Sequence, residues 1–264
     1  MKDAILRESG GRAMPIILAC GFVLFVQPCG AQVGEGIRGV TQLEQSNARS
    51  NIVTFQELTH NVPKTARAEM EKADKASAKD RSDEAIQHLN RAILMDPEYV
   101  AARNNLAVIY FKMGKSELAI AQLEEAVKVD PHNATLFTNL SVGLLKINKL
   151  DGAERAARTT LDLDRTSASQ ARMLLGLALI RQGKFTDEAL ECFSRSREEY
   201  PLARLLAGGV LIAQSKPERA KPEIQMYLSS PAPDCRAAAN RWLALIDQGK
   251  ETSAVMTPAT GTKD

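Results

Sequence analysis

The chain has 264 residues, a formal net charge of +2 and 5% aromatic residues. Lysine and arginine do not gather in one block, so the charge balance argues against a basic nucleic-acid-binding face. The few aromatic side chains also argue against a platform on which bases stack. No apolar run approaches the roughly 18–20 residues that a membrane-spanning helix needs. We therefore expect neither a nucleic-acid partner nor a stable membrane span in the mature chain.

The first 31 residues have the pattern of a secretory signal peptide. A mildly basic leader precedes a mostly apolar run at 13–26, and small residues before Gln32 offer a cleavage site near Ala31. We therefore expect an exported protein, periplasmic or secreted after cleavage. Two alternatives stay open. In the first, the leader is kept as an N-terminal membrane anchor. In the second, Cys20 carries a lipid, because residues 17–20 resemble a lipobox.

Residues 32–62 are expected to form a flexible or extended lead-in. The stretch 32–50 is rich in glycine and polar residues and has no period. Residues 51–58 suit either a short strand or an extended segment that packs its apolar side chains on the first helical hairpin. At the other end, residues 249–264 lack periodicity and are expected to be disordered.

Residues 100–133 contain two apolar runs with helical spacing, separated by a tight turn at Gly114 and ended by Pro131. Glycine tolerates the positive φ of a helix exit, and proline cannot continue a helix. The buried faces of the two runs are marked by Leu106, Ala107, Tyr110, Ala119, Leu123 and Ala126. A hairpin of this size cannot bury its apolar face alone, so similar hairpins should flank it.

The same frame recurs on both sides of this hairpin. Upstream, Leu89 and Pro97 lie 34 residues before Leu123 and Pro131. The expected units are residues 66–99, 100–133, 134–167, 168–202 and a degenerate 203–234, followed by a capping helix at 235–247.

This pattern resembles the tetratricopeptide repeat, in its exported bacterial type. The matching residues are Leu106, Ala107 and Tyr110 in the first helix of the unit and Ala119, Leu123, Ala126 and Pro131 in and after the second. Arg103 stands where the family usually has tryptophan. The resemblance implies an all-α fold, a right-handed superhelix (α-solenoid) of about four to five antiparallel helix pairs and a cap over residues 63–248. It also implies a concave groove lined by the first helix of each unit.

The family's groove positions supply the candidate peptide-binding residues. They are Asn104, Asn105, Val108, Phe111, Lys112, Thr138, Asn139, Val142, Leu145, Lys146, Leu177 and Arg181. Asn105 and Asn139 lie 34 residues apart and should stack, and an amide there can bind the backbone of an extended peptide. The alternative is that these amides bridge neighbouring helices by hydrogen bonds.

A column of cations, Lys112, Lys146 and Arg181, ends three successive first helices. One interpretation is structural: such cations complement the dipole at the C-terminal end of a helix. The other is functional: if they act in binding, they favour an acidic partner. The family's carboxylate clamp is not expected. Its positions hold Met70, Asp74, Asn105, Thr135 and Asn139, of which only Asn105 fits.

No catalytic or metal constellation is apparent. The three histidines, His60, His88 and His132, lie far apart in the sequence, and no HExxH, CxxC or phosphate-binding loop occurs. His88, beside Leu89, is expected to face solvent. We expect no catalytic residue, no metal and no cofactor.

Two of the four cysteines, Cys20 and Cys29, lie in the expected signal peptide. An exported protein can form disulfides, but a full unit separates Cys192 from Cys235, which places them beyond the roughly 7 Å limit between bridged Cα atoms. We expect Cys192 to be a packing residue and Cys235 a semi-exposed free thiol.

The sequence therefore favours a non-catalytic interaction scaffold that binds an extended peptide or a helix of a protein partner in its groove. The alternative is a structural subunit fixed in an envelope complex or a homo-oligomer. An enzyme is a remote third possibility.

Overall fold

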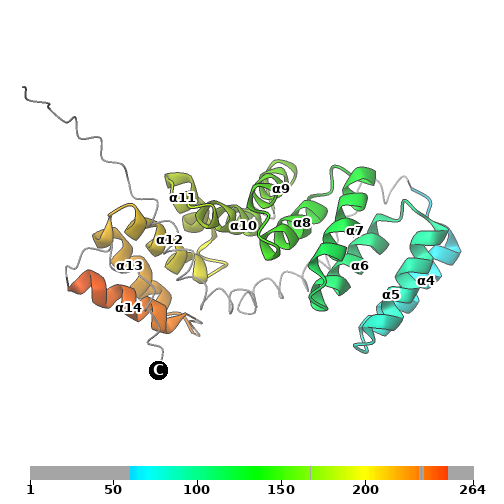
Figure 1. Cartoon of the computed structure of the whole chain (residues 1–264), viewed down its shortest axis with the longest axis horizontal. Coiled ribbons are helices and arrows are strands. Elements are labelled where there is room, and N and C mark those ends of the chain that lie inside the picture. The colour runs from blue at the N-terminus through cyan, green and yellow to red at the C-terminus, as the bar shows by residue number, and fades with distance from the viewer. Residues whose placement is uncertain (1–59, 167, 232, 234, 249–264) are drawn as a thin grey trace, which may run out of the picture.

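The computed structural model describes residues 60–166, 168–231, 233 and 235–248, and every regular element in these ranges is an α-helix (Figure 1). The helices form consecutive antiparallel pairs. The pairs are α4 (Lys64–Ser77) with α5 (Ser82–Met95), α6 (Val100–Lys112) with α7 (Ser116–Val129), α8 (Ala134–Lys146) with α9 (Leu150–Leu163), α10 (Ala168–Arg181) with α11 (Asp187–Ser196), and α12 (Leu202–Ala213) with α13 (Pro217–Leu228). The last helix, α14 (Arg236–Asp247), packs on α13. The expected signal peptide, most of the lead-in and the tail lie outside the described residues.

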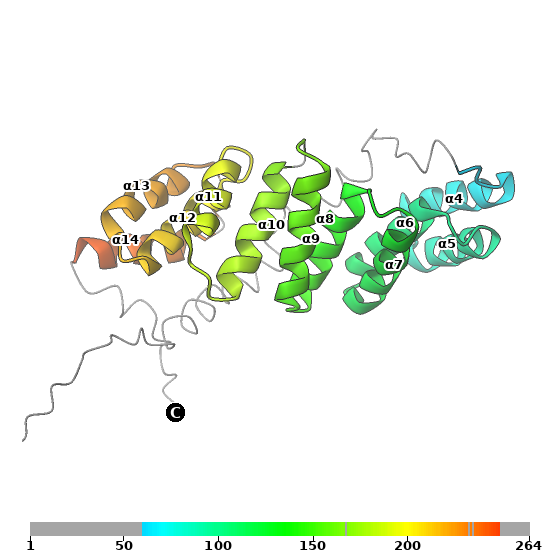
Figure 2. The same ribbon diagram turned by 90° about the horizontal axis from the view of Figure 1, so that it is seen from above.

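The five pairs follow one another along an arc (Figures 1 and 2). Each pair packs chiefly on the pairs next to it. In Figure 1, α7, α9 and α11 lie along the upper side of the arc, with α6, α8 and α10 below them. The all-α solenoid of stacked helix pairs is thus confirmed, and the degenerate fifth unit forms a complete pair, α12 with α13.

Every first helix ends in the same backbone turn. A residue with positive φ follows each one: Asp80 (54°), Gly114 (73°), Asn148 (61°), Gly183 (77°) and Ser215 (58°). The next residue donates its backbone N–H to a carbonyl five positions earlier, in the bonds Arg81–Ala76, Lys115–Tyr110, Lys149–Leu144, Lys184–Leu179 and Lys216–Leu211. This is the Schellman arrangement. The turn between the helices of each unit is therefore fixed by backbone geometry, whether or not glycine stands there.

Replacing Ser215 by glycine should raise the free energy of unfolding by about 0.5–1 kcal/mol. An L-residue with left-handed backbone costs roughly 1–2 kcal/mol, and the greater freedom of glycine in the unfolded chain offsets part of that gain. Urea unfolding of both chains measures the difference. Ser229→Gly is the matched control, because Ser229 follows α13 with an ordinary φ of −78°. Equal effects of the two changes would contradict this explanation.

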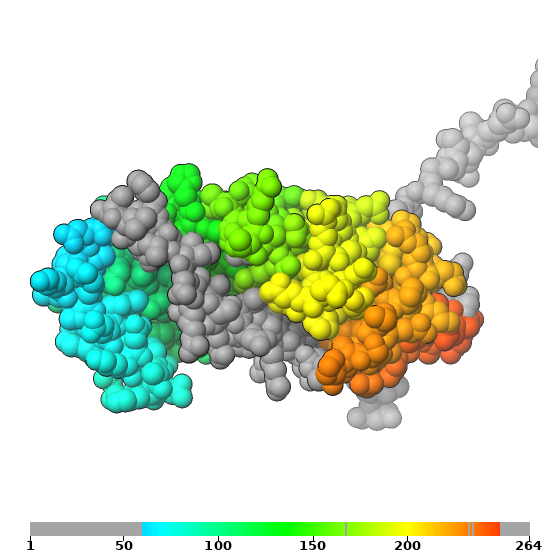
Figure 3. All heavy atoms as spheres, turned by 180° about the vertical axis from the view of Figure 1, so that it is seen from behind, coloured from blue at the N-terminus to red at the C-terminus, as the bar shows by residue number. Residues whose placement is uncertain are grey.

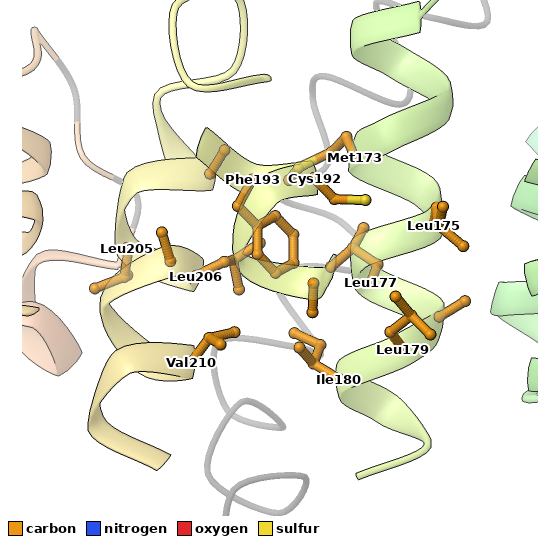
Figure 4. Close-up of a cluster of buried hydrophobic side chains, with 14 of the residues drawn as sticks. Met173, Leu175, Leu177, Leu179, Ile180, Cys192, Phe193, Leu205, Leu206 and Val210 are labelled. Carbon is orange, nitrogen blue, oxygen red and sulfur yellow. The ribbon is translucent and has the colours of Figure 1, made fainter. Parts of the chain in front are cut away.

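The largest apolar core lies under units three to five. Residues 173–180 of α10 are all buried, so this helix is enclosed on every side. At its centre lies the Phe193 ring from α11, which is 0% exposed (Figure 4). This ring lies against Gly176 of α10. A Cβ atom on Gly176 would come within 2.7 Å of that ring, so the glycine is what lets α10 and α11 approach. Size complementarity between a glycine and an aromatic ring therefore holds the fourth unit together.

The two described cysteines lie in this core. Cys192 is buried and free, as expected for a packing residue, and burial raises the pKa of its thiol to about 11. The prediction for Cys235 was wrong: it is 5% exposed and disulfide-bonded. The Cys235 backbone N–H donates to the buried Tyr227 hydroxyl over 2.8 Å, and this bond draws the start of α14 against α13. The sequence argument had considered only a bond between Cys192 and Cys235.

An ion-pair network joins units three and four. Glu154 of α9 accepts hydrogen bonds from Arg158 (2.9 Å), Gln182 (3.0 Å) and Lys184 (3.0 Å). Arg158 in turn reaches Glu188 of α11, with contacts of 2.6 and 3.1 Å. Burial by itself raises the pKa of Glu154, but the bonds from Lys184, Gln182 and Arg158 outweigh it and lower that pKa to about 2. The network therefore stabilises this junction while Glu154 is ionised.

Glu154→Gln should lower the free energy of unfolding by about 1 kcal/mol at pH 7, a modest value because the cationic partners are half exposed and screened by water. A carboxyl whose pKa falls on folding contributes stability that is complete above its unfolded pKa of 4.5 and is lost as the pH drops towards 2. The difference between parent and variant should vanish over that interval. Urea unfolding at several pH values measures it. Glu191→Gln, from an ion pair in which both side chains are 60% exposed, is the control and should show almost no effect. A difference for Glu154 that stays constant with pH would contradict the assignment.

Candidate peptide-binding groove

The twelve predicted groove residues lie on α6, α8 and α10, the first helices of units two to four. Within each helix the positions repeat at helical spacing, and side-chain contacts described below link α6 to α8 and α8 to α10. The structure thus places them on three successive helices. It does not leave all of them equally accessible.

The asparagines bind across the junctions between units. Asn139 Nδ2 of α8 donates to Asn104 Oδ1 of α6 over 2.8 Å. Asn105 Nδ2 of α6 reaches back to α4, 3.4 Å from Asp74 Oδ1 and 3.9 Å from Met70 Sδ. The Asn139–Asn104 hydrogen bond is short, whereas the contacts of Asn105 are at the long end for a hydrogen bond. Both amides therefore bridge neighbouring first helices, and the weakly held one is that of Asn105.

The Asp74 carboxyl beside Asn105 is perturbed by its surroundings. Burial raises its pKa, the Asn105 amide lowers it, and the neighbouring Glu71 carboxylate raises it further, with a net upward shift. The Asn105 amide thus offsets part of the rise in the pKa of Asp74 that burial causes.

The three cations of the predicted column have different surroundings. Lys112 at the end of α6 is exposed. The Lys146 ammonium lies 5.0 Å from the centre of the Phe111 ring, a cation–π contact between units two and three. Arg181 donates to the Leu145 carbonyl over 2.7 Å and to Asn148 Oδ1 over 2.9 Å, and burial lowers its pKa. Arg181, the last residue of α10, therefore caps the C-terminal end of α8, the preceding first helix.

Several of the predicted residues point into the packing between helices. Thr138 is 2% exposed, and its hydroxyl donates to the Ala134 carbonyl of its own helix over 2.9 Å and lies 3.3 Å from Thr160 Oγ1 of α9. Phe111 is 5% exposed and its ring lies against Gly143 of α8. The apolar positions Val142, Leu145 and Leu177 are also buried. Most of the accessible part of the predicted set is on α6, where Asn104, Asn105 and Val108 are half-buried and Lys112 is exposed. Outside α6, Lys146 is exposed and Arg181 is half-buried.

The sequence missed two histidine–carboxylate contacts in the first unit. His88 was expected to face solvent, which is wrong: its Nδ1 lies 2.7 Å from Glu69 Oε2, with only 14% of the side chain exposed. The hydrogen bonds from His88 and Lys72 lower the pKa of Glu69 to about 2. His60 Nε2 lies 2.8 Å from Asp96 Oδ2 and so ties the segment before α4 to the end of α5. The Glu69–His88 pair joins α4 to α5 within the first unit, and the His60–Asp96 pair joins the lead-in to that unit.

The described ranges hold no cluster of three or more metal-binding side chains. Among their helices, none combines the length and the apolar character needed to cross a membrane.

Comparison with known proteins agrees with this geometry. Two tetratricopeptide repeat family models match residues 76–136 and 138–204. A search of curated protein sequences found no significant match.

Similar solved structures include MamA, with 23% identity over 62% of this chain and 90% of that one and a TM-score of 0.58. PilF of Pseudomonas aeruginosa shares 19% identity over 73% of this chain and 88% of its own, with a TM-score of 0.59. YrrB, described as a tetratricopeptide repeat protein with an unusual peptide-binding site, shares 18% identity over 74% and 98%, with a TM-score of 0.55. At such identities the likeness establishes the fold alone. This chain thus carries tetratricopeptide repeats over residues 76–136 and 138–204, within a solenoid of stacked helix pairs.

Proposed function

We propose that the protein is an exported, non-catalytic scaffold that binds an extended peptide or a helix of a partner protein along α6 and α8. The observation that carries this proposal is the accessible strip on α6, in which Asn104, Asn105, Val108 and Lys112 follow one another along one helix. Tetratricopeptide repeats generally act in protein–protein interaction, which supports the same class of function.

The strip offers the contacts that an extended peptide needs. The Asn105 amide is held only by long contacts to Asp74 and Met70, so a peptide backbone can replace them at low cost. Val108 supplies apolar area. Lys112 and Lys146, at the ends of α6 and α8, favour an acidic residue in the partner.

Affinity capture from an envelope extract tests this proposal. The baits are the parent chain, the groove variant Asn105→Ala/Asn139→Ala/Lys146→Ala and the matched control Asn90→Ala/Gln121→Ala/Lys128→Ala. The control removes two amides and one lysine from the exposed faces of α5 and α7. Circular dichroism first confirms that all three are folded. We expect the parent and the control to retain a partner that the groove variant loses. Retention by all three baits would refute the groove.

Export rests on the leader pattern alone, and the number of cysteines left in the mature chain offers a test of how the leader is processed. Cleavage near Ala31 removes Cys20 and Cys29 and leaves Cys192 and Cys235 as the two cysteines of the mature chain. An anchored or lipidated chain keeps at least one of the leader cysteines. Intact mass and thiol titration of the exported protein distinguish the cleaved chain from the anchored or lipidated chain. Cleavage predicts a mass that begins near Gln32 and two titratable thiols after denaturation.

A fixed structural subunit is the second candidate, and exposed apolar side chains favour it. Leu94 and Met95 at the end of α5 are 83% and 47% exposed, and Met226 on α13 is 53% exposed. Sedimentation of the purified chain distinguishes a fixed structural subunit from a peptide-binding scaffold. A stable large particle that dissociates on Leu94→Asp would favour the subunit, whereas a monomer favours the scaffold.

A further inference from the structure

The accessible strip on α6 borders a face of α4 that carries two carboxylates. Glu71 and Asp74 lie three residues apart on α4, so they share one face of that helix, and both are exposed. This face adjoins the strip, because the Asn105 amide of α6 lies 3.4 Å from Asp74 Oδ1. An extended peptide that lies along the strip therefore passes both carboxylates.

The two carboxylates repel each other and lack a cationic partner. The Glu71 charge raises the pKa of Asp74, in addition to the larger rise that partial burial causes. Within the described part of the chain neither carboxylate forms an ion pair, whereas Glu69, Glu84 and Asp96 of the same unit each do. The acidic charge at this place is thus left uncompensated.

The nearest cations of α4 do not change this balance. Arg67 and Lys75 lie four residues before and after Glu71. Both are exposed, and in the structure as described neither is paired with Glu71 or Asp74. A basic residue of a partner therefore has two accessible carboxylates to bind.

The sign of the charge changes along the groove. Units two and three hold neutral residues where unit one has its two carboxylates: Asn105, Val108, Asn139 and Val142. At the ends of α6 and α8 stand the exposed cations Lys112 and Lys146. The accessible groove is therefore acidic at unit one and cationic at the far end of the next two first helices.

An extended peptide can reach both charged places. Asp74 and Lys112 lie on neighbouring first helices, and Lys112 stands four residues further along the repeat frame than Asp74. Helix axes roughly 10 Å apart and a rise of about 6 Å over four residues put the two about 12 Å from each other. An extended chain covers that distance in about three or four residues.

We infer that the groove selects peptides in which an arginine or a lysine lies three or four positions from an aspartate or a glutamate. This inference rests on the proposed peptide-binding function and states its specificity. The basic side chain lays its aliphatic stem over the half-buried Met70 and places its charge between Glu71 and Asp74. The acidic side chain pairs with Lys112. Arginine is favoured over lysine, because its planar fork can donate to two carboxylates at once.

Selection from random dodecapeptides displayed on phage tests this specificity, with the full mature chain as target. Glu71→Gln/Asp74→Asn removes both charges and keeps the shapes of the side chains. The matched control, Glu124→Gln/Asp162→Asn, removes one glutamate and one aspartate from exposed positions on α7 and α9. The groove variant Asn105→Ala/Asn139→Ala/Lys146→Ala completes the set, and circular dichroism first confirms that every variant is folded.

We expect the parent to enrich peptides with the stated pair of charges and the groove variant to lose them. Glu71→Gln/Asp74→Asn should weaken their binding about tenfold, whereas the control should leave it unchanged. Selection on Asp74→Lys should replace the basic residue of the peptides by an acidic one, an outcome that a merely structural role of Asp74 would not produce.

The effect should also depend on pH. A basic ligand residue binds the ionised form of Asp74, whose pKa is already raised. The affinity of the parent for a selected peptide should therefore fall as the pH drops from 7 towards 4 and approach that of Glu71→Gln/Asp74→Asn. Titration of one selected peptide against both chains measures the convergence.

The outcomes separate this inference from the proposed function. Enriched peptides that need the groove but lack a basic residue would overturn the specificity and leave peptide binding standing. The absence of any peptide that needs the groove would overturn both. Unchanged binding to Glu71→Gln/Asp74→Asn, or an equal loss in the control, would show that these two carboxylates do not select the ligand.

Discussion

Phe193→Ala is expected to lower the free energy of unfolding by about 3–5 kcal/mol, which is a large part of the total stability of a domain. The Phe193 ring is 0% exposed and is packed among Leu177, Leu206 and Val210 (Figure 4). It also fills the space that Gly176 leaves between α10 and α11. Alanine would leave a cavity there, because helices on both sides are fixed by their own neighbours and cannot collapse into it.

Urea unfolding followed by circular dichroism measures this loss. Phe137→Ala is the matched control, since Phe137 is half-buried and already borders an open cavity. Phe137→Ala should lower the free energy of unfolding by about 1 kcal/mol, because this substitution removes few packing contacts. Equal losses in the two variants would contradict the role given to the Phe193–Gly176 contact.

Gly143→Val should destabilise the protein by about 3 kcal/mol through overpacking. A Cβ on Gly143 would lie 2.6 Å from Phe111 Cζ and 2.9 Å from Ile120 Cγ1, far closer than normal contact. The Phe111 ring cannot withdraw freely, since it is 5% exposed and lies below Lys146. The junction of units two and three would therefore be forced apart.

A double variant shows whether this clash is the cause. Phe111→Leu removes the ring that valine would strike, so Gly143→Val should cost much less in that background. Unfolding of the parent, both single variants and the double variant gives the coupling between the two positions. Strict additivity would contradict the mechanism.

Figure 3 shows one face of the solenoid as a surface. Seen from behind, units one and five form the two ends of an elongated body (Figure 3). Such an elongated stack has a large surface for its size.

The repeat frame was readable from the sequence because each unit must bury the same helix faces. Leu106, Leu123 and Ala126 are all buried, as their spacing predicted. The turn geometry was predicted at Gly114, and the positive φ of Gly183 was not. The same positive φ at Asp80, Asn148 and Ser215 was missed, since a residue with a side chain gives no signal for it.

The groove was predictable as a set of positions and not as a set of accessible side chains. The period of about 34 residues places Asn139 above Asn105, but the donor of Asn139 turns to Asn104 instead. Phe111 turns inward because Gly143, one unit later, leaves room for it. Such outcomes depend on pairs of residues in different units, which a single-helix pattern does not contain.

Site-specific photo-crosslinking tests the central claim, partner binding along α6, most directly. A benzoylphenylalanine at Val108 lies in the accessible strip, and one at Leu94, 83% exposed on α5, lies away from it. The account predicts that illumination in an envelope extract crosslinks a partner to the Val108 derivative and not to the Leu94 derivative. A partner crosslinked only from Leu94, or equally from both positions, would contradict it.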